Sequence, residues 1–203
     1  MSNQSQASTL LSMLNMQPKP SPLSESALVI IDAQREYLDG SLPLHQIDKA
    51  LIELKELLMR ARKLDIPIFH IVHHAPSGAP IFNPDGEFSH IIDAVKPIDK
   101  EQVIIKHSPS SFVGTDLEKL LKEQKKQNLV LGGFMTHMCI NATARGASDL
   151  GFAATVVAST CATRDLPGLD GQVLRAEDVH KTNLAALADL VACVIPSIKE
   201  LSD

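Results

Sequence analysis

Short apolar runs alternate with amphipathic segments along most of the chain. Runs rich in β-branched residues predict buried strands at 27–32, 67–73, 102–106, 129–133, 153–159 and 192–195. Apolar residues at helical spacing predict helices at 47–64, at 115–126, from the fourth strand to Leu150, and at about 172–190. The strands are continuously apolar, which is typical of a parallel sheet covered on both faces. The pattern therefore predicts an α/β fold.

The first part of the chain has a different composition. Residues 1–26 are rich in Ser, Gln and Pro, so we expect a flexible N-terminal arm with a short helix around Leu10–Leu14. The remainder, 27–203, has the length of one domain with a sizeable core.

Composition excludes several classes of protein. A formal net charge of −5, with 3% aromatic residues, argues against nucleic-acid binding. No apolar run approaches the roughly 20 residues that span a bilayer, and the first residues do not resemble a secretory signal. The three cysteines are too few and too widely spaced for a disulfide framework. We expect a cytoplasmic protein that acts on a small molecule, with neither nucleic acid nor membrane as a partner.

Three residues with chemical potential lie at or just after predicted strands. Asp32 ends the first strand, Lys106 ends the third, and Cys139 follows the fourth near the start of a helix. In a parallel sheet these ends meet at the edge where ligands bind. A helix start favours a thiolate, and its free amides can receive an oxyanion. Each residue alone is also compatible with a structural role, but a carboxylate, an amine and a thiol together are what a cysteine nucleophile needs.

The segments around these residues resemble the isochorismatase-like (cysteine hydrolase) family. The similarity covers about 27–195 and rests on Ala27–Gln34, on Val103–Lys106 with the following Ser110–Phe112 and Gly114–Leu117, and on Gly132–Thr143. The resemblance implies a Rossmann-like, three-layer α/β/α fold with a six-stranded parallel sheet. It also implies hydrolysis of a C–N bond in a small amide, carbamoyl compound or nitrogen ring, without a cofactor, by a homodimer or homotetramer.

Residue by residue, the resemblance implies a catalytic triad of Asp32, Lys106 and Cys139. Asp32 would take the thiol proton, Lys106 would stabilise the thiolate, and Cys139 would form a thioester with the substrate. The family also places a non-proline cis peptide bond in this turn, which maps to Phe134–Met135. The amides of Met135 and Cys139 would then form the oxyanion hole.

Other residues near the predicted edge are candidates for the substrate pocket: Gln34, Tyr37, His73, Phe112, Thr136, His137 and Arg164. Tyr37 and Phe112 fit an aromatic wall or plain packing equally well, and Arg164 fits a substrate contact or an ion pair with Asp165. We expect no metal site, because His70 and His73 point to opposite faces of a strand and no Asp-x-His motif follows it.

Three alternatives remain open. The first is a vinyl-ether hydrolase, the reaction of true isochorismatases, which resemble this chain but lack the nucleophilic cysteine. The second is a non-catalytic paralogue that binds a small molecule or a partner subunit. The third is a redox-sensing thiol, for which a resolving cysteine would have to lie close to Cys139 in space. Cys161 and Cys193 are expected to be small core residues instead.

Overall fold

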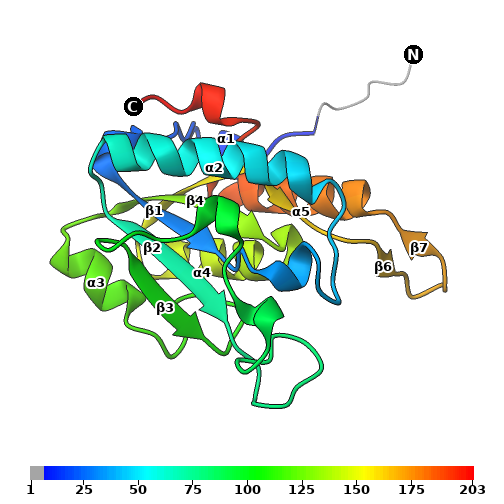
Figure 1. Ribbon diagram of the computed structural model, residues 1–203. Coiled ribbons are helices and arrows are strands. Elements are labelled where there is room, and N and C mark those ends of the chain that lie inside the picture. The colour runs from blue at the N-terminus through cyan, green and yellow to red at the C-terminus, as the bar shows by residue number, and fades with distance from the viewer. Residues whose placement is uncertain (1–6) are drawn as a thin grey trace.

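A single parallel sheet forms the centre of the molecule (Figure 1). The computed structural model describes residues 7–203. The strand order is β3-β2-β1-β4-β5-β8. The strands are β1 (Ser26–Ile31), β2 (Ile68–His73), β3 (Gln102–Lys106), β4 (Asn128–Phe134), β5 (Ala153–Ala162) and β8 (Cys193–Ile195). The predicted six-stranded, three-layer fold is thereby confirmed.

Helices cover both faces of this sheet. They are α1 (Leu10–Met13), α2 (Ile47–Lys63), α3 (Leu117–Glu123), α4 (Asn141–Asp149) and α5 (Ala176–Leu190). Helix α2 lies on one face, and α3 and α4 lie on the other (Figure 1). Alternate residues of β1 enter different cores: Leu28 and Ile30 pack with α2, whereas Val29 and Ile31 pack with α3, α4 and α5. This double burial explains why the strands are apolar without alternation.

The order of the strands fixes where a ligand can bind. The chain moves outward from β1 through β2 to β3, then returns to place β4 on the other side of β1. The ends of β1 and β4 therefore lie side by side where the order reverses, and such a point is the usual ligand site of open α/β sheets. Asp32 directly follows β1, and Cys139 lies in a π-helical turn (Thr136–Ile140) that follows β4.

The prediction of a helix from residue 172 is wrong in its first part. Leu166–Pro167 (β6) and Val173–Leu174 (β7) form a small antiparallel ribbon that projects from the body, and α5 begins only at Ala176 (Figure 1). The physical reason is a local cap, since the Asp165 carboxylate accepts the Ala176 N–H at 2.7 Å. That bond starts the helix four residues later than the apolar pattern indicates.

The expected N-terminal arm is attached to the body over part of its length. The predicted short helix is present as α1, where Leu11 is buried and the Leu10 N–H donates to Asp189 of α5 at 2.8 Å. Residues 1–6 lie outside the described part of the chain. Short 3-10 turns occur at Leu23–Glu25, Arg35–Tyr37, Glu87–Ser89, Asp93–Val95 and Ile198–Glu200.

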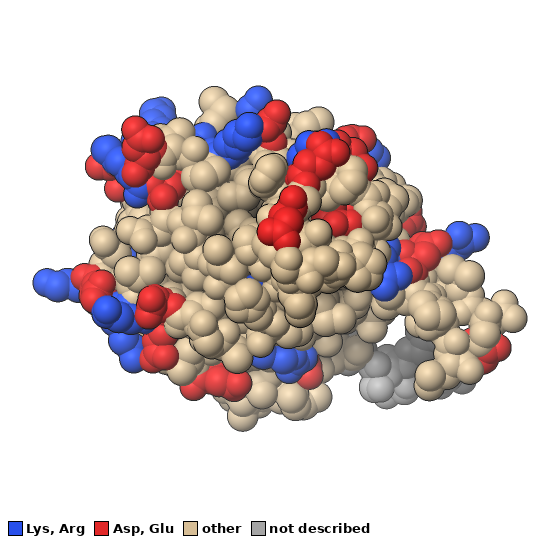
Figure 2. Space-filling view, turned by 60° about the horizontal axis from the view of Figure 1, so that its bottom comes forward, with Lys and Arg blue, Asp and Glu red and all other residues tan. Residues whose placement is uncertain are grey.

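The surface carries charges of both signs. On the face shown in Figure 2, basic and acidic side chains alternate around the periphery and leave a broad central area without charged groups. None of the helices between residues 7 and 203 is long and apolar enough to cross a membrane.

Candidate active site

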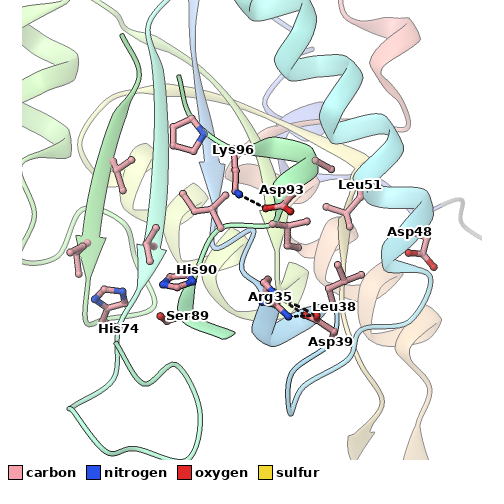
Figure 3. Close-up of a pocket in the computed structure, with 17 residues that line it drawn as sticks. Arg35, Leu38, Asp39, Asp48, Leu51, His74, Ser89, His90, Asp93 and Lys96 are labelled. Carbon is pink, nitrogen blue, oxygen red and sulfur yellow. Dashed lines mark hydrogen bonds and ion pairs between the residues drawn. The ribbon is translucent and has the colours of Figure 1, made fainter. Parts of the chain in front are cut away.

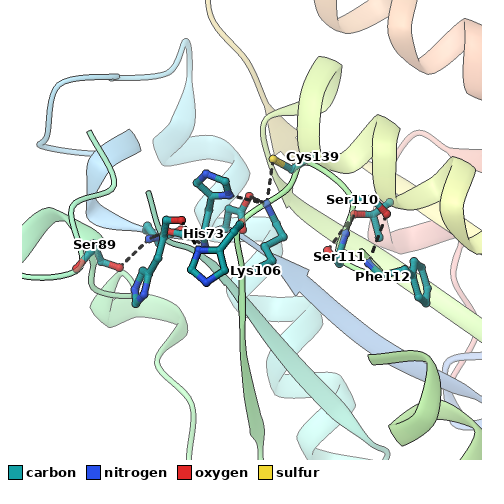
Figure 4. Close-up of polar contacts among 12 residues, drawn as sticks. His73, Ser89, Lys106, Ser110, Ser111, Phe112 and Cys139 are labelled. Atoms are coloured by element: carbon teal, nitrogen blue, oxygen red, sulfur yellow. Dashed lines mark hydrogen bonds and ion pairs between the residues drawn. The ribbon is translucent and has the colours of Figure 1, made fainter. Parts of the chain in front are cut away.

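Asp32, Lys106 and Cys139 come together at the carboxyl edge of the sheet. The Lys106 ammonium nitrogen lies 2.8 Å from Asp32 Oδ2 and 3.3 Å from Cys139 Sγ (Figure 4). Asp32 and Lys106 are completely buried, and Cys139 is 5% exposed. A buried carboxylate and ammonium are tolerated in a core only when they are paired, as they are here. The cation thus bridges the acid and the thiol.

Burial changes the proton affinities of these groups. Desolvation raises the pKa of Asp32, and its contacts with Lys106 and Cys139 only partly oppose that effect. Burial and the nearby Asp32 charge also raise the pKa of the Cys139 thiol, against the opposing effect of Lys106. Burial thus favours the neutral forms of both groups, and the Lys106 cation opposes this effect at both.

The turn that holds Cys139 has a specific backbone. The Phe134–Met135 peptide bond is cis, as expected from the resemblance. Gly133 precedes it with a φ of 121°, and a Cβ atom there would lie 2.1 Å from the Ile31 carbonyl oxygen. Only glycine fits between β4 and β1 at this point. The Met135 carbonyl accepts N–H groups from Met138 and Ile140, which closes the turn.

Thr136 and His137 fasten this turn to β5. The Thr136 hydroxyl donates to the Ala162 carbonyl at 3.1 Å and lies 2.8 Å from His180 Nδ1. His137 Nδ1 lies 2.5 Å from the Thr163 hydroxyl. Thr136 is fully buried. Thr136 was a pocket candidate, but these bonds make it a support of the turn, because its hydroxyl is already engaged by β5 and α5.

His73 ends β2 next to Lys106. The two residues are partners in the β2–β3 register, so their side chains point to the same face. His73 Nδ1 lies 3.2 Å from the Lys106 ammonium nitrogen (Figure 4). Burial and the Lys106 charge lower the pKa of His73 to about 4, so the ring is neutral near pH 7. The structure thus adds a fourth polar group to the three at the strand ends.

An aromatic group lies next to these residues. Tyr37 is buried, and its ring packs edge-on against Phe82 and Phe134 with centroids 5.3 Å and 5.9 Å away. Phe82 also packs edge-on against the His73 ring at 5.1 Å. Burial and the negative charge of Asp32 raise the pKa of Tyr37 well above its usual range. Sequence reasoning missed Phe82, because only the course of the loop after β2 brings it here.

Arg164 does not form the expected ion pair with its neighbour. Its guanidinium donates to the backbone carbonyl of Asp165 at 3.2 Å, whereas the Asp165 carboxylate pairs with Arg175. The buried Arg164 Nε has no hydrogen-bond partner among residues 7–203. The Arg164 charge is close enough to lower the pKa of His137. A cation without a carboxylate partner thus lies near the turn that carries Cys139.

Two pocket candidates have structural roles instead. The Gln34 amide donates to the carbonyls of His73 and Ser89 and accepts the His73 N–H at 2.8 Å, so its polar atoms are committed to backbone. Phe112 is half-buried and stacks on Phe152 with centroids 5.7 Å apart, at the edge of the core beneath α4. The structure thus gives both residues other contacts, since Gln34 links β2 to the loop at residue 89 and Phe112 packs against the core.

His70 is separated from His73 by the sheet. Its ring is buried on the α2 side, where Nε2 lies 2.7 Å from Glu101 Oε2, and Arg62 of α2 binds the same carboxylate. Within residues 7–203, no group of three or more His, Cys, Asp or Glu side chains is arranged to hold a metal ion. His73 Nδ1 is engaged by Lys106.

A large cavity lies elsewhere. It measures about 1200 Å³ and runs along β2 and β3 on the α2 side of the sheet, between α2 and the segment at 89–97 (Figure 3). Its charged groups include the Arg35–Asp39 and Lys96–Asp93 pairs. A second cavity of about 590 Å³ lies between α2, β5 and α5. Asp32, Lys106 and Cys139 line neither of these two cavities.

Comparison with known proteins agrees with this geometry. The model of the Isochorismatase domain matches residues 26–198. A crystal structure of an isochorismatase from Pseudomonas putida KT2440 is 37% identical, with a TM-score of 0.91 over 96% of this chain and 99% of that one. A secreted isochorismatase effector of Verticillium dahliae is 36% identical over 94% of this chain and 97% of its own length. A streptothricin hydrolase of Streptomyces noursei is 28% identical over 82% of this chain and 57% of its own length.

Proposed function

Because this chain belongs to the isochorismatase family of hydrolases, we propose that it cleaves a carbon–nitrogen bond of a small amide, carbamoyl compound or nitrogen ring. Asp32, Lys106 and Cys139 are the proposed catalytic triad. The observation that carries the proposal is the buried ammonium of Lys106, which lies 2.8 Å from the Asp32 carboxylate and 3.3 Å from the Cys139 sulfur. This arrangement supplies a base, a nucleophile and a cation for the sulfur in one enclosed site.

The first step is acylation of the sulfur. Asp32 accepts the thiol proton as the sulfur attacks the substrate carbonyl, and Lys106 stabilises the negative charge on sulfur at the start of the attack. The amides of Met135 and Cys139 receive the oxyanion of the tetrahedral intermediate. When this intermediate collapses, the C–N bond breaks, the nitrogen takes the proton from Asp32, and a thioester remains on Cys139.

The second step returns the enzyme to its resting state. Asp32, ionised again, takes a proton from water, and the oxygen of that water attacks the thioester carbonyl. The C–S bond breaks, the acid product leaves, and the sulfur regains the proton held by Asp32. Each turnover consumes one water and releases one amine or ammonia and one acid. The raised pKa of Asp32 suits both proton transfers, because it brings the base closer to neutral pH.

The surroundings favour a small substrate with a polar or anionic end. Cys139 is only 5% exposed, which leaves little room beside the sulfur. The unpaired Nε of Arg164 and the charge of that guanidinium provide a partner for a carbonyl or carboxylate of the substrate. Tyr37 and Phe82 supply an apolar wall on the other side of His73.

A substrate panel tests the proposal. Primary amides, ureas, carbamoyl compounds and lactams are scored for release of ammonia or acid, with isochorismate included as a vinyl ether. We expect turnover in one C–N class and its loss by at least about 10³-fold in Cys139→Ala. Cys193→Ala is the matched control and keeps full activity, because that thiol lies on the far edge strand β8.

Two results would overturn the proposed function. If isochorismate is the sole substrate turned over, and Cys139→Ala does not slow its turnover, the protein is a vinyl-ether hydrolase. Two related proteins are named isochorismatases. Turnover of an amide by folded Cys139→Ala at the wild-type rate would remove the thioester mechanism. Trapping the acyl group on Cys139 by mass spectrometry of acid-quenched enzyme provides the direct positive result.

A further inference from the structure

We propose that His73 is a positioning residue that holds the Lys106 ammonium between Asp32 and Cys139 by accepting one of its N–H bonds. This inference rests on the proposed function, because it assigns His73 a part in activating the same thiol. No comparison gives His73 a role.

The first argument is the number of acceptors around Lys106. An ammonium group has three N–H donors, and burial without acceptors is costly for each of them. Lys106 is completely buried. Its nitrogen has three neighbours, namely Asp32 Oδ2 at 2.8 Å, His73 Nδ1 at 3.2 Å and Cys139 Sγ at 3.3 Å. Asp32 forms an ion pair with the ammonium, whereas His73 and Cys139 are its hydrogen-bond acceptors. The imidazole is therefore one of the two hydrogen-bond acceptors of this buried group.

The second argument is the protonation state of the ring. A nitrogen that accepts a hydrogen bond from an ammonium cannot carry a proton itself, so the proton of neutral His73 must be on Nε2. Burial and the Lys106 charge lower the pKa of His73 to about 4, which keeps the ring neutral over the physiological range. Neighbouring His107 and His74 lower the pKa of His73 further. The same contact thus fixes both the tautomer and the charge.

The third argument is that the ring is itself held in place. The backbone N–H and carbonyl of His73 are both bound by the Gln34 side chain, at 2.8 Å and 3.0 Å. The ring lies edge-on to Phe82, with an angle of 84° between the planes. The Phe82 N–H is in turn bound by the buried carboxylate of Glu36 at 3.1 Å. Residues outside the triad thus orient Nδ1 toward Lys106.

The consequence concerns the base. Without an acceptor at residue 73, the N–H of Lys106 that now binds His73 would turn toward Asp32, which is the strongest acceptor within reach. A hydrogen bond from the cation, added to the ion pair, would stabilise the carboxylate and weaken it as a base. Proton transfer from Cys139 would then be less favourable, although all three triad residues would still be present. His73 therefore affects the reactivity of the thiol and not only its packing.

The experiment measures thiol reactivity directly and needs no substrate. The rate of Cys139 alkylation by iodoacetamide is recorded against pH, with peptide mapping to separate the three cysteines. The acceptor is removed in His73→Leu and His73→Phe, and is restored in His73→Asn, whose side-chain oxygen can occupy the position of Nδ1. The matched control is His74→Leu, because the adjacent side chain makes no contact with Lys106.

We expect alkylation of Cys139 at pH 7 to fall at least about tenfold in the acceptor-free variants and to recover in His73→Asn, since removal of supporting contacts typically costs about 10–100-fold. His74→Leu keeps the wild-type profile. If either His73→Leu or His73→Phe does not fold, the alkylation rate of the other variant is used for the test. Long-range ¹H–¹⁵N NMR of the unmodified protein should place the His73 proton on Nε2 between pH 5 and 8.

An unchanged alkylation profile in a folded acceptor-free variant, or a proton on Nδ1, would overturn the role of His73. Either result leaves the proposed function standing, provided that Cys139→Ala is inactive. Conversely, an active Cys139→Ala variant overturns the proposed function, whatever the alkylation profile of the His73 variants.

Discussion

Gly133 is the residue on which the position of Cys139 depends most directly. Its φ of 121° is unfavourable for any side chain, and a Cβ atom would lie 2.1 Å from the Ile31 oxygen and 2.8 Å from the Ile31 nitrogen. Both obstacles are backbone atoms of β1, which cannot move without breaking the sheet. Gly133→Ala is therefore expected to lower the free energy of unfolding by more than about 3 kcal/mol, measured by urea titration.

Gly151→Ala is the matched control for this substitution. Gly151 has a φ of 81°, but nothing lies within 4 Å of the position that a Cβ atom would take there. Only the backbone strain remains, so a loss of about 1 kcal/mol is expected. Equal losses in the two variants would show that strain, and not the contact with β1, explains the requirement for glycine at 133.

The residue types at the site could be predicted from the sequence, but their contacts could not. Asp32, Lys106 and Cys139 are recognisable because each lies at or just after an apolar run. The contact between His73 and Lys106 depends on the register of β2 against β3, which the sequence pattern does not fix. The position of Phe82 against Tyr37 and His73 depends on the path of the loop after β2. The raised pKa of the Cys139 thiol depends first on burial, which the sequence pattern does not report.

Glu101 shows how a charged group joins three elements. It precedes β3 and binds Arg62 of α2 at 2.7 Å and His70 of β2 at 2.7 Å, and it also accepts the Ile98 N–H at 3.1 Å. The Glu101 side chain is 4% exposed. Glu101→Gln leaves Arg62 without its counter-ion, so we expect the free energy of unfolding to fall by about 3 kcal/mol in urea titration.

The control is Glu118→Gln, which removes an exposed ion pair with Lys122 within α3. Such pairs contribute little, so a change within about 0.5 kcal/mol is expected. Because the Glu101 group lies on the α2 side of the sheet, the Glu101→Gln protein should keep its kcat below the unfolding transition. A large loss of kcat at full folding would mean that the two faces of the sheet are coupled.

Elements were easier to predict than their ends. The strands follow from continuous apolar runs because both faces of the sheet are buried. The ribbon of β6 and β7 was missed because its stability depends on Asp165, which binds the start of α5 across eleven residues. Local patterns do not report such a contact. The edge where Asp32, Lys106 and Cys139 meet was nevertheless predictable, since it follows from strand direction alone.

At the scale of the whole molecule, buried histidines predict acid sensitivity. Burial lowers the pKa of five of them, His70, His73, His74, His137 and His180, from 6.5, and that of His73 reaches about 4. At a pH between 6.5 and the lowered pKa of each folded-state histidine, the unfolded chain binds more protons than the folded one. The free energy of unfolding therefore falls as the pH falls. The raised pKa of Asp32 has the opposite effect on the pH dependence of stability, but it concerns one group against several histidines.

We therefore expect the urea midpoint to fall from pH 7 to pH 5, above the range where carboxylates with ordinary pKa values of 3.8 and 4.5 take up protons. His73→Asn should make this dependence shallower, since it removes one of the five groups. A midpoint that stays constant or rises over this range would show that the histidines titrate alike in both states.

The outer face of β3 leads to a prediction about assembly. β3 is the edge strand of the sheet, and Val103 and Ile105 on its outer face are 50% and 49% exposed beside the cavity of about 1200 Å³. Parallel strands are usually covered on both faces, so two exposed β-branched residues on such a strand are typical of a surface that a partner covers. We propose a homodimer or homotetramer in which a second copy covers this face.

Val103→Glu tests this assembly, because a carboxylate placed on the apolar face would be buried without a partner in the oligomer but solvated in the monomer. Light scattering at micromolar concentration should give a multiple of the monomer mass for the wild-type protein and a smaller mass for the variant. Val113→Glu is the control, since Val113 is 58% exposed in the loop before α3 and its substitution should leave the mass unchanged. A monomeric wild-type protein would contradict the proposal, and an oligomer insensitive to Val103→Glu would place its interface on another face.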